Sequence, residues 1–273
     1  MKHRRILALA AAVMILLTGC RQAEGMPPVT EPEASTPAVS QTLPAEPATQ
    51  PAEQPTEPSQ PETEPAVALH SGIREDGSFD EGTLFIGDSL TYGLVLEYLE
   101  PNGLLGEARY IAMPGAVVSV FFTGPSLRTN GPVMSAYSPE FEGLTMSEAV
   151  AVAADDVTAV YYMMGTNYSR YVTTDTYIEI VSYLLETCPE ATIYLQLVPL
   201  SRSAYVAYGK VNQQLSDVYQ HFSAQREERV MLIDTYTAIG ANLIHDGIHL
   251  TAAGQACWYD ALVAFAEENR IPQ

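Results

Sequence analysis

The stretch TLFIGDSLTYG, residues 83–93, decides the fold of this chain. Its apolar run at 84–86 predicts a short buried strand that ends at Gly87. Ser89 follows two residues later, just before a segment that can form a helix. A hydroxyl at such a turn lies at the carboxyl edge of a sheet, near the positive end of the next helix, and is well placed to be a nucleophile. Gly-Asp-Ser is also a common turn composition, so the later strands must decide between nucleophile and ordinary loop.

The first 20 residues have the composition of a secretory signal. A basic start precedes an apolar run at 6–17 that is too short to span a membrane comfortably. The sequence LTGC at 17–20 then resembles a bacterial lipobox, in which the signal is cut before the cysteine and the cysteine carries lipid. We therefore expect Cys20 to anchor the mature protein outside the cytoplasm, on the bacterial cell membrane. The alternative is an ordinary signal peptide with an incidental cysteine.

Residues 21–66 differ sharply in composition from the rest of the chain. They contain eleven of its 19 prolines among Glu, Thr, Ala, Gln and Ser, with almost no large apolar residue. Such a segment buries too little surface to offset the entropy of ordering it. We predict a disordered linker that holds the following domain away from the membrane.

Residues 67–273 are enough for one domain with a substantial core. These residues include 25 acidic and nine basic side chains, and their formal charge of −16 argues against nucleic acid and anionic lipid headgroups as partners. Cys188 and Cys257 fall in stretches with helical spacing. Two cysteines make no disulfide framework, so we predict two buried, unpaired thiols with no nucleophilic role.

Apolar runs and helical spacings alternate along this domain. Further strands are predicted at 108–112, 159–164, 192–198 and 230–233, and helices at 94–99, 145–154, 174–187, 204–226 and from 251 onward. Thr145 and Glu148 have the spacing of a capping box at the start of the second helix. This alternation predicts a three-layer α/β/α sandwich with a five-stranded parallel sheet.

The segment 119–143 has no clear period. It mixes aromatic residues with Gly, Pro, Ser and Asn. Long segments of this kind often form lids or substrate walls, and an irregular cover on the sheet is the alternative.

Polar candidates follow the predicted strands in order. Gly115 follows the second strand, Asn167 the third, and Asp246 and His249 the fifth, so all of them fall at the same sheet edge as Ser89. A serine hydroxyl needs a base within hydrogen-bond reach, and a histidine oriented by an aspartate supplies one. The backbone N–H groups of Ser89 and Gly115 and the Asn167 amide suit a developing oxyanion.

These residues closely resemble the motifs of the SGNH (GDSL-type) hydrolase family. The blocks appear as GDSL at 87–90 with Gly93 after it, as Gly115 alone, as GTN at 165–167 and as DGIHLT at 246–251. The family usually has an acid after the asparagine, whereas Tyr168 stands here. Because Asn167 itself is kept, we expect this departure to alter the local loop and the fit of the substrate more than the chemistry.

The resemblance implies a flavodoxin-like fold and a serine hydrolase. By this resemblance Ser89 is the nucleophile, His249 the base and Asp246 its partner, with an oxyanion hole from Ser89, Gly115 and Asn167. It implies ester substrates, which include acetylated carbohydrates, acylated cell-wall glycans and lysophospholipids. We expect an esterase that removes an O-acyl or O-acetyl group from a carbohydrate or cell-wall glycan, outside the cytoplasm.

Other functions remain open from the sequence. The alternatives are a lysophospholipase-type esterase, an acyl transferase on the same fold, and a non-catalytic glycan-binding module. His245, Asp246 and His249 also suggest metal ligands, but Gly247 breaks the helix that His-x-x-x-His zinc sites use. We therefore expect neither a metal nor a cofactor.

Overall fold

The computed structural model describes residues 69–124, 127, 137–167, 171–199, 205–240 and 246–269. All of them belong to one compact unit, Glu62–Gln273. The expected signal segment 1–20, with Cys20, and the expected linker 21–66 lie outside the described residues. The same is true of His245.

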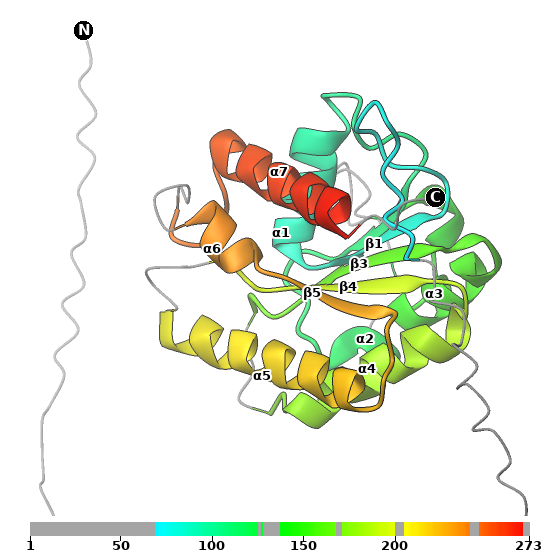
Figure 1. Cartoon of the computed structure of the whole chain (residues 1–273), viewed down its shortest axis with the longest axis vertical. Helices are drawn as coiled ribbons and strands as arrows, with labels where there is room; N and C mark the ends of the chain where they lie inside the picture. Colours follow the sequence, from blue (N-terminus) through cyan, green and yellow to red (C-terminus); the bar gives the residue numbers. More distant parts are fainter. Residues whose placement is uncertain are drawn as a thin grey trace, which may run out of the picture. The chain divides into compact units, whose positions relative to one another are not determined.

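A five-stranded, fully parallel sheet forms the middle layer (Figure 1). The strand order is β2-β1-β3-β4-β5, in which the chain reverses direction across the sheet between β1 and β3. Every residue of β1, β3 and β4 is buried, as expected for parallel strands covered on both faces. The strands are β1 Thr83–Gly87, β2 Arg109–Ala112, β3 Ala159–Met163, β4 Thr192–Gln196 and β5 Val230–Ile233.

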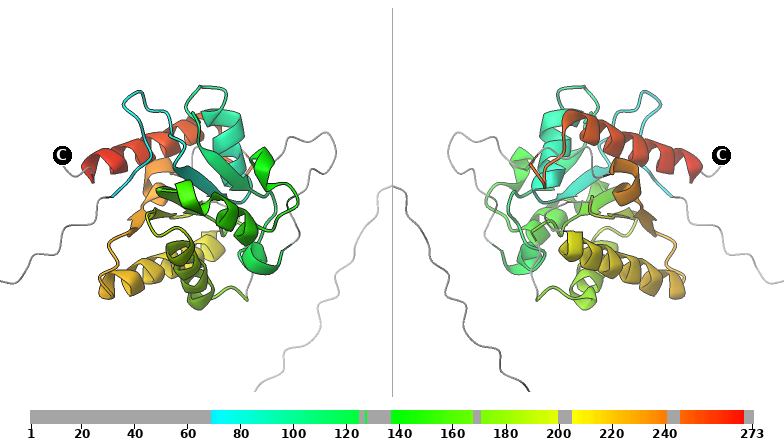
Figure 2. Two further views of the ribbon diagram at one scale, coloured as in Figure 1. Left: turned by 90° about the vertical axis from the view of Figure 1, so that its right-hand side faces the viewer. Right: turned by 90° about the vertical axis from the view of Figure 1, so that its left-hand side faces the viewer.

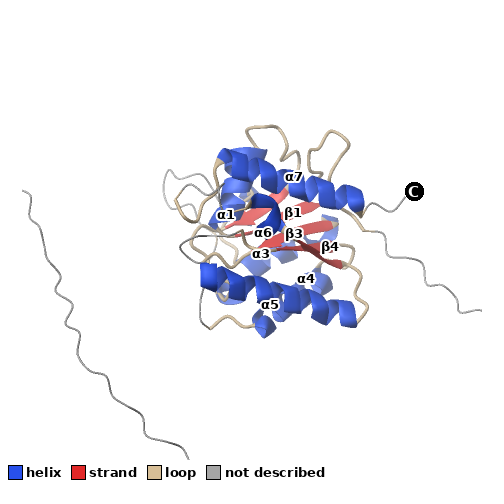
Figure 3. Ribbon diagram, turned by 60° about the vertical axis from the view of Figure 1, so that its left-hand side comes forward, coloured by secondary structure: helices blue, strands red, loops and turns tan. Residues whose placement is uncertain are grey.

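Helices cover both faces of the sheet, which confirms the predicted three-layer sandwich (Figures 2 and 3). One face carries α1 Ser89–Tyr92, its continuation η1 Gly93–Leu99, and α7 Ala252–Glu268, with α6 Thr235–Ile239 beside α7. The other face carries α4 Thr174–Thr187 and α5 Tyr205–Ala224. The remaining elements are α2 Val120–Thr123, η2 Pro139–Phe141, α3 Met146–Ala153 and η3 Ala154–Asp156.

Several elements differ from the prediction, mostly by one or two residues at their ends. The first helix begins at Ser89 rather than at residue 94, because the Asp88 side chain accepts the Leu90 N–H and caps it. Its second part, η1, is a π-helix. The short helix α6 was not predicted; its start is capped by Asp234, which accepts the Thr237 N–H. Strand β4 ends at Gln196, two residues earlier than predicted.

An aromatic column joins the central strands on the α7 face of the sheet. Phe85, Tyr161 and Tyr194 are neighbours in register, and their rings stack at centroid distances of 5.3 and 4.8 Å. Phe265 of α7 meets the Tyr194 ring edge-on. Burial of one such side chain stabilises the fold by about 1.5–3 kcal/mol. The column therefore fixes β1 and β3, whose carboxyl ends carry the candidate residues.

The described part of the segment 119–143 packs as a cover. The aromatic side chains of Phe121, Tyr137 and Phe141 are buried, and Tyr137 forms an isolated bridge with Ile111 of β2. Residues 125–126 and 128–136 lie outside the described residues. The lid alternative for that part stays a prediction.

Both cysteines of the described domain are unpaired, as predicted. Cys188 is buried, and its burial raises the pKa of the thiol to about 11. Cys257 is only half-buried, so the prediction of a buried thiol is wrong for this residue, which lies on a partly exposed side of α7. Among the described residues, no helix has the length and apolar character needed to span a bilayer.

Candidate active site

The candidate residues meet at the carboxyl edge of the sheet. Ser89 follows β1 and begins α1, and Asn167 follows β3 in the adjacent loop. Strands β1 and β3 flank the point at which the strand order reverses, where open α/β sheets bind their ligands. The fold therefore places the site where this class of sheet provides a crevice.

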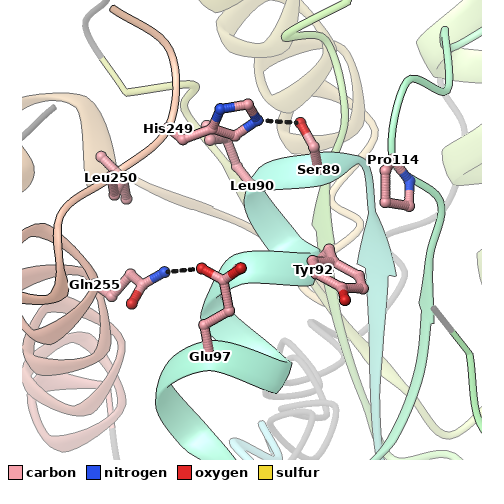
Figure 4. Close-up of a pocket in the computed structure, with 9 residues that line it drawn as sticks. Ser89, Leu90, Tyr92, Glu97, Pro114, His249, Leu250 and Gln255 are labelled. Atoms are coloured by element: carbon pink, nitrogen blue, oxygen red, sulfur yellow. Dashed lines mark hydrogen bonds between the residues drawn. The ribbon is translucent and has the colours of Figure 1, made fainter. Parts of the chain in front are cut away.

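A chain of hydrogen bonds joins Asp246, His249 and Ser89. The distance from His249 Nε2 to Ser89 Oγ is 3.2 Å (Figure 4). The distance from His249 Nδ1 to Asp246 Oδ2 is 2.7 Å. When Nδ1 carries the ring proton and donates a hydrogen bond to Asp246, Nε2 carries the lone pair that can accept the Ser89 hydroxyl proton. This is the arrangement that activates a serine hydroxyl as a nucleophile.

The loop 246–251, called here the base loop, is fixed largely by its own hydrogen bonds. Asp246 Oδ1 accepts the backbone N–H groups of Ile248 at 2.9 Å and His249 at 2.7 Å. Together with the bond from the His249 ring, these bonds hold the pKa of Asp246 well below its ordinary value. Asp246 therefore stays ionised and can orient the histidine and stabilise its protonated form.

Helix α7 connects the base loop to the core. Thr251 caps α7 by accepting the Gly254 N–H, and Leu250 is buried beside it. Trp258 of α7 donates to Gln196 Oε1 of β4 at 2.7 Å, and both side chains are buried. The base loop thus joins a helix that is anchored to the sheet.

Asp88 holds the nucleophile and the loop after β3 together. Its carboxylate is fully buried and accepts four hydrogen bonds: the Leu90 N–H, the Gly165 N–H, and the N–H and hydroxyl of Thr166. Burial raises the pKa of Asp88, although these donors oppose the rise. We call this set of contacts the Asp88 network; Tyr208 of α5 extends it by donating to Thr166 O at 3.1 Å.

Gly115 occupies a tight turn after β2. The Ala116 N–H donates to Met113 O at 3.0 Å, Pro114 takes the second position, and Gly115 takes the third with φ +80°. This is the pattern of a type II turn, which requires glycine there. A Cβ on Gly115 would have no atom within 4 Å, so the space beside this backbone is open.

Asn167 points to the Gly115 turn. Its Nδ2 donates to Ala116 O at 3.0 Å, which uses one of the two amide hydrogens. The second amide hydrogen can donate to another acceptor. The Ser89 N–H belongs to the first turn of its helix, where backbone donors have no intrahelical partner.

A pocket of about 350 Å³ opens beside Ser89 and His249. Leu90, Tyr92 and Pro114 contribute to its walls, and Glu97 and Gln255 add a polar pair (Figure 4). In the described part of the chain, no group of three His, Cys, Asp or Glu side chains is placed to hold a metal ion.

The structure brings Ser89, Asp246 and His249 into contact and links Asn167 to the turn that contains Gly115. Sequence reasoning missed the role of Asp88 and the pair formed by Glu97 and Gln255. An aspartate between a strand and a helix does indicate a cap, and that signal was available for Asp88. No local pattern identifies the pair, because its two members are 158 residues apart.

No family model and no curated protein match the sequence. Among solved structures, the chain is similar to a carbohydrate esterase family 3 protein from Talaromyces cellulolyticus, with 15% identity over 68% of this chain and 96% of that chain and a TM-score of 0.45. It is also similar to a lipase/acylhydrolase from Enterococcus faecalis, with 18% identity over 70% and 98% of the two chains and a TM-score of 0.45.

A third similar structure is a member of the lipolytic protein G-D-S-L family from Veillonella parvula, with 15% identity over 67% of this chain and 96% of that chain and a TM-score of 0.44. Of the three, this one bears the name of the class that the sequence motifs resemble. Because identities and TM-scores are this low, the assignment of the site rests on its geometry.

Proposed function

We propose that this protein is a serine esterase of the SGNH (GDSL) type, which hydrolyses a carboxylic ester through an acyl-enzyme. The observation that carries the proposal is the hydrogen-bonded chain from Asp246 through His249 to Ser89. It lies at the carboxyl edge of a parallel sheet and beside a pocket that includes Ser89 and His249.

In the first half-reaction, Ser89 Oγ attacks the ester carbonyl carbon while its proton passes to His249 Nε2. The C–O bond to the alcohol then breaks, and the same proton goes to the leaving alkoxide oxygen, which leaves an acetyl or acyl ester on Ser89. In the second half-reaction, His249 takes a proton from water and the resulting hydroxide attacks the acyl carbon. The bond from this carbon to Ser89 Oγ then breaks, the carboxylic acid leaves, and the proton returns from His249 to Ser89 Oγ. Asp246 stabilises the protonated imidazole in both steps.

The negative charge that develops on the carbonyl oxygen needs hydrogen-bond donors. The Ser89 N–H, the Gly115 N–H and the second hydrogen of Asn167 Nδ2 form the proposed oxyanion hole. The bond from Asn167 to Ala116 O and the type II turn support this assignment, because they keep the amide beside the Gly115 backbone. Such preorganised donors stabilise the transition state more than the ground state.

The substrate that we propose is an O-acyl or O-acetyl ester on a carbohydrate or cell-wall glycan. The lipobox at 17–20 and the proline-rich segment 21–66 support a protein tethered outside the cytoplasm through Cys20. The acidic composition makes an anionic phospholipid a poor partner. No metal or cofactor is needed for this chemistry.

Hydrolysis of 4-nitrophenyl acetate by the purified protein tests the reaction, and release of acetate from an acetylated glycan tests the substrate. We expect Ser89→Ala to abolish both activities. Ser119→Ala is the matched control, because Ser119 makes no side-chain cap bond and does not line the pocket. Equal rates for folded wild type and Ser89→Ala would refute the esterase, and activity on lysophospholipid alone would refute the glycan substrate.

A further inference from the structure

The pocket beside Ser89 has a wall that is mostly apolar and is polar in one place. Its volume of about 350 Å³ is near the lower end of the range of about 300–1,000 Å³ that is usual for small-molecule sites. It therefore fits one small group, such as a single ring, better than a long chain. Most of its wall is apolar, formed by Leu90, Tyr92, Pro114 and Leu250. A carboxylate and an amide, from Glu97 of η1 and Gln255 of α7, interrupt this wall (Figure 4).

The Gln255 side chain is buried, with 5% of its surface exposed, yet it is bonded only loosely to Glu97. The distance from Gln255 Nε2 to Glu97 Oε2 is 3.4 Å, near the long limit for a hydrogen bond. Buried amides usually have well-formed partners, and a glutamine amide offers two hydrogens and one acceptor oxygen. The Gln255 amide and the Glu97 carboxylate can therefore bind hydroxyl groups of a bound molecule together.

Gly93 keeps the space between these two side chains open. A Cβ at this position would lie 3.0 Å from Gln255 Nε2 and 3.5 Å from Glu97 Oε2. The residue has helical backbone angles, with φ −61° and ψ −46°, so its backbone does not require glycine. A methyl group here would narrow the pocket next to the polar pair without straining the helix.

The position of His249 shows which part of an ester enters the pocket. His249 lines it, as does Ser89, which carries the nucleophile and one of the three proposed oxyanion donors; the other two donors, Gly115 and Asn167, do not line it. In the tetrahedral intermediate the oxyanion faces its donors, and the leaving oxygen faces the base that protonates it. A pocket on the His249 side therefore receives the group attached to the leaving oxygen, which is the alcohol.

We propose that this pocket is the alcohol subsite of the enzyme, and that Glu97 and Gln255 are specificity-determining residues that select a neutral or cationic hydroxyl-bearing alcohol and disfavour an anionic one. This inference rests on the proposed esterase function. The Glu97 carboxylate accepts hydrogen bonds from hydroxyl groups, attracts a cation and repels an anion. Since Glu97 is exposed, solvent screening keeps the charge effect modest.

Acetate esters that differ only in their alcohol provide the test, because all of them form the same acetyl-enzyme. We compare kcat/KM for acetylcholine, which is cationic, an acetylated methyl glucoside, which is neutral, and O-acetylglycolate, which is anionic. Glu97→Gln removes both the attraction for acetylcholine and the repulsion of O-acetylglycolate. The ratio of kcat/KM for acetylcholine to kcat/KM for O-acetylglycolate is therefore expected to fall about 5- to 10-fold. Gly93→Ala is expected to slow the glucoside more than 4-nitrophenyl acetate.

Glu100→Gln is the matched control, because Glu100 is an exposed acid three residues from Glu97 that does not line the pocket. It should leave the ratio unchanged. A second series keeps 4-nitrophenol as the alcohol and varies the acyl group among acetate, propionate and butyrate. If Glu97→Gln or Gly93→Ala changes this acyl preference and not the alcohol preference, the alcohol assignment is overturned.

Two failures are distinguishable. Unchanged alcohol selectivity in a Glu97→Gln variant that still hydrolyses 4-nitrophenyl acetate overturns the subsite alone. Wild-type protein that is folded but shows no Ser89-dependent hydrolysis of any of these esters overturns the esterase function and the subsite with it.

Discussion

Asp88 directly precedes Ser89 in the chain, Asp246 bonds the histidine that contacts Ser89, and the surroundings of the two aspartates are opposite in kind. Asp88 is completely buried, and its partners come from the helix start and from a loop almost 80 residues away. The Asp246 side chain is 41% exposed, and its bonds go to residues two and three positions further along the chain. Burial raises the pKa of Asp88, whereas the bonds from His249 and Ile248 lower the pKa of Asp246.

This difference separates two tasks of the site. The Asp88 network joins distant segments, so it fixes Ser89 relative to the loop that carries Asn167 and contributes to the stability of the whole sheet edge. The bonds of Asp246 orient one imidazole and stay within the base loop. Changes in the base loop should therefore reduce activity without unfolding the protein, and changes in the Asp88 network should affect both.

The largest effect is expected from Asp246→Asn. An asparagine can keep part of the loop geometry but cannot stabilise the imidazolium or enforce the productive tautomer, so kcat should fall about 10³–10⁴-fold. The unfolding midpoint in urea should change little. Asp234→Asn is the matched control, because Asp234 also accepts backbone N–H but caps α6. A kcat within a few-fold of wild type would contradict the role of Asp246.

Asn167→Ala should have the next largest effect. Loss of one oxyanion donor typically lowers kcat about 10²–10³-fold, while KM changes less. Asn102→Ala serves as the control, because the Asn102 amide also donates to a backbone carbonyl, that of Tyr98, and does not line the pocket. A rise in KM with kcat unchanged would show that Asn167 binds the substrate in the ground state and is not an oxyanion donor.

Thr166→Val tests the Asp88 network. The valine removes the 2.6 Å bond to Asp88 Oδ2 and leaves a buried carboxylate with one donor fewer, which should destabilise the fold by about 1–3 kcal/mol. The activity loss should be smaller than that of Asn167→Ala. Thr91→Val is the control at the same edge, where only a 3.4 Å bond to Met163 O is lost. Urea denaturation of both variants measures the difference, and equal midpoints would contradict the network's structural role.

The smallest effect concerns pH. Because the pKa of Asp88 is raised in the folded protein, its ionisation opposes folding, and this penalty fades as the pH falls toward the ordinary value of 3.8. Because the pKa of Asp246 is lowered, its contribution is present above 3.8 and is lost as the pH falls below that value. The free energy of unfolding of the wild type, relative to that of Asp88→Asn, should thus rise on acidification from neutral pH. Relative to that of Asp246→Asn, it should decrease once the pH is lower than 3.8. Urea titrations at several pH values measure both slopes, and slopes of the same sign would contradict the comparison.

The sequence predicted what depends on local pattern. The strand before Ser89, the helix 174–187 and the capping box of Thr145 and Glu148 all follow from residues close together in the chain. The chain of contacts from Asp246 to Ser89 was also predicted, because parallel strands bring their carboxyl ends to one edge.

Features that depend on distant partners were missed. Asp88 owes its role to Gly165 and Thr166, 77 and 78 residues further along. Gln255 meets Glu97 only because α7 packs against η1. No periodic pattern or motif spacing in the sequence indicates either contact, because both arise only when the elements pack together in the fold.

Labelling with a fluorophosphonate, followed by peptide mass mapping, tests the central claim most directly, because it reports an activated serine without knowledge of the substrate. The account predicts a single label on Ser89 in the wild type, no label in Ser89→Ala, and strongly slowed labelling in His249→Gln, with Ser119→Ala labelled as fast as the wild type. A folded wild-type protein that takes up no label, or a label that persists after Ser89→Ala, would contradict it.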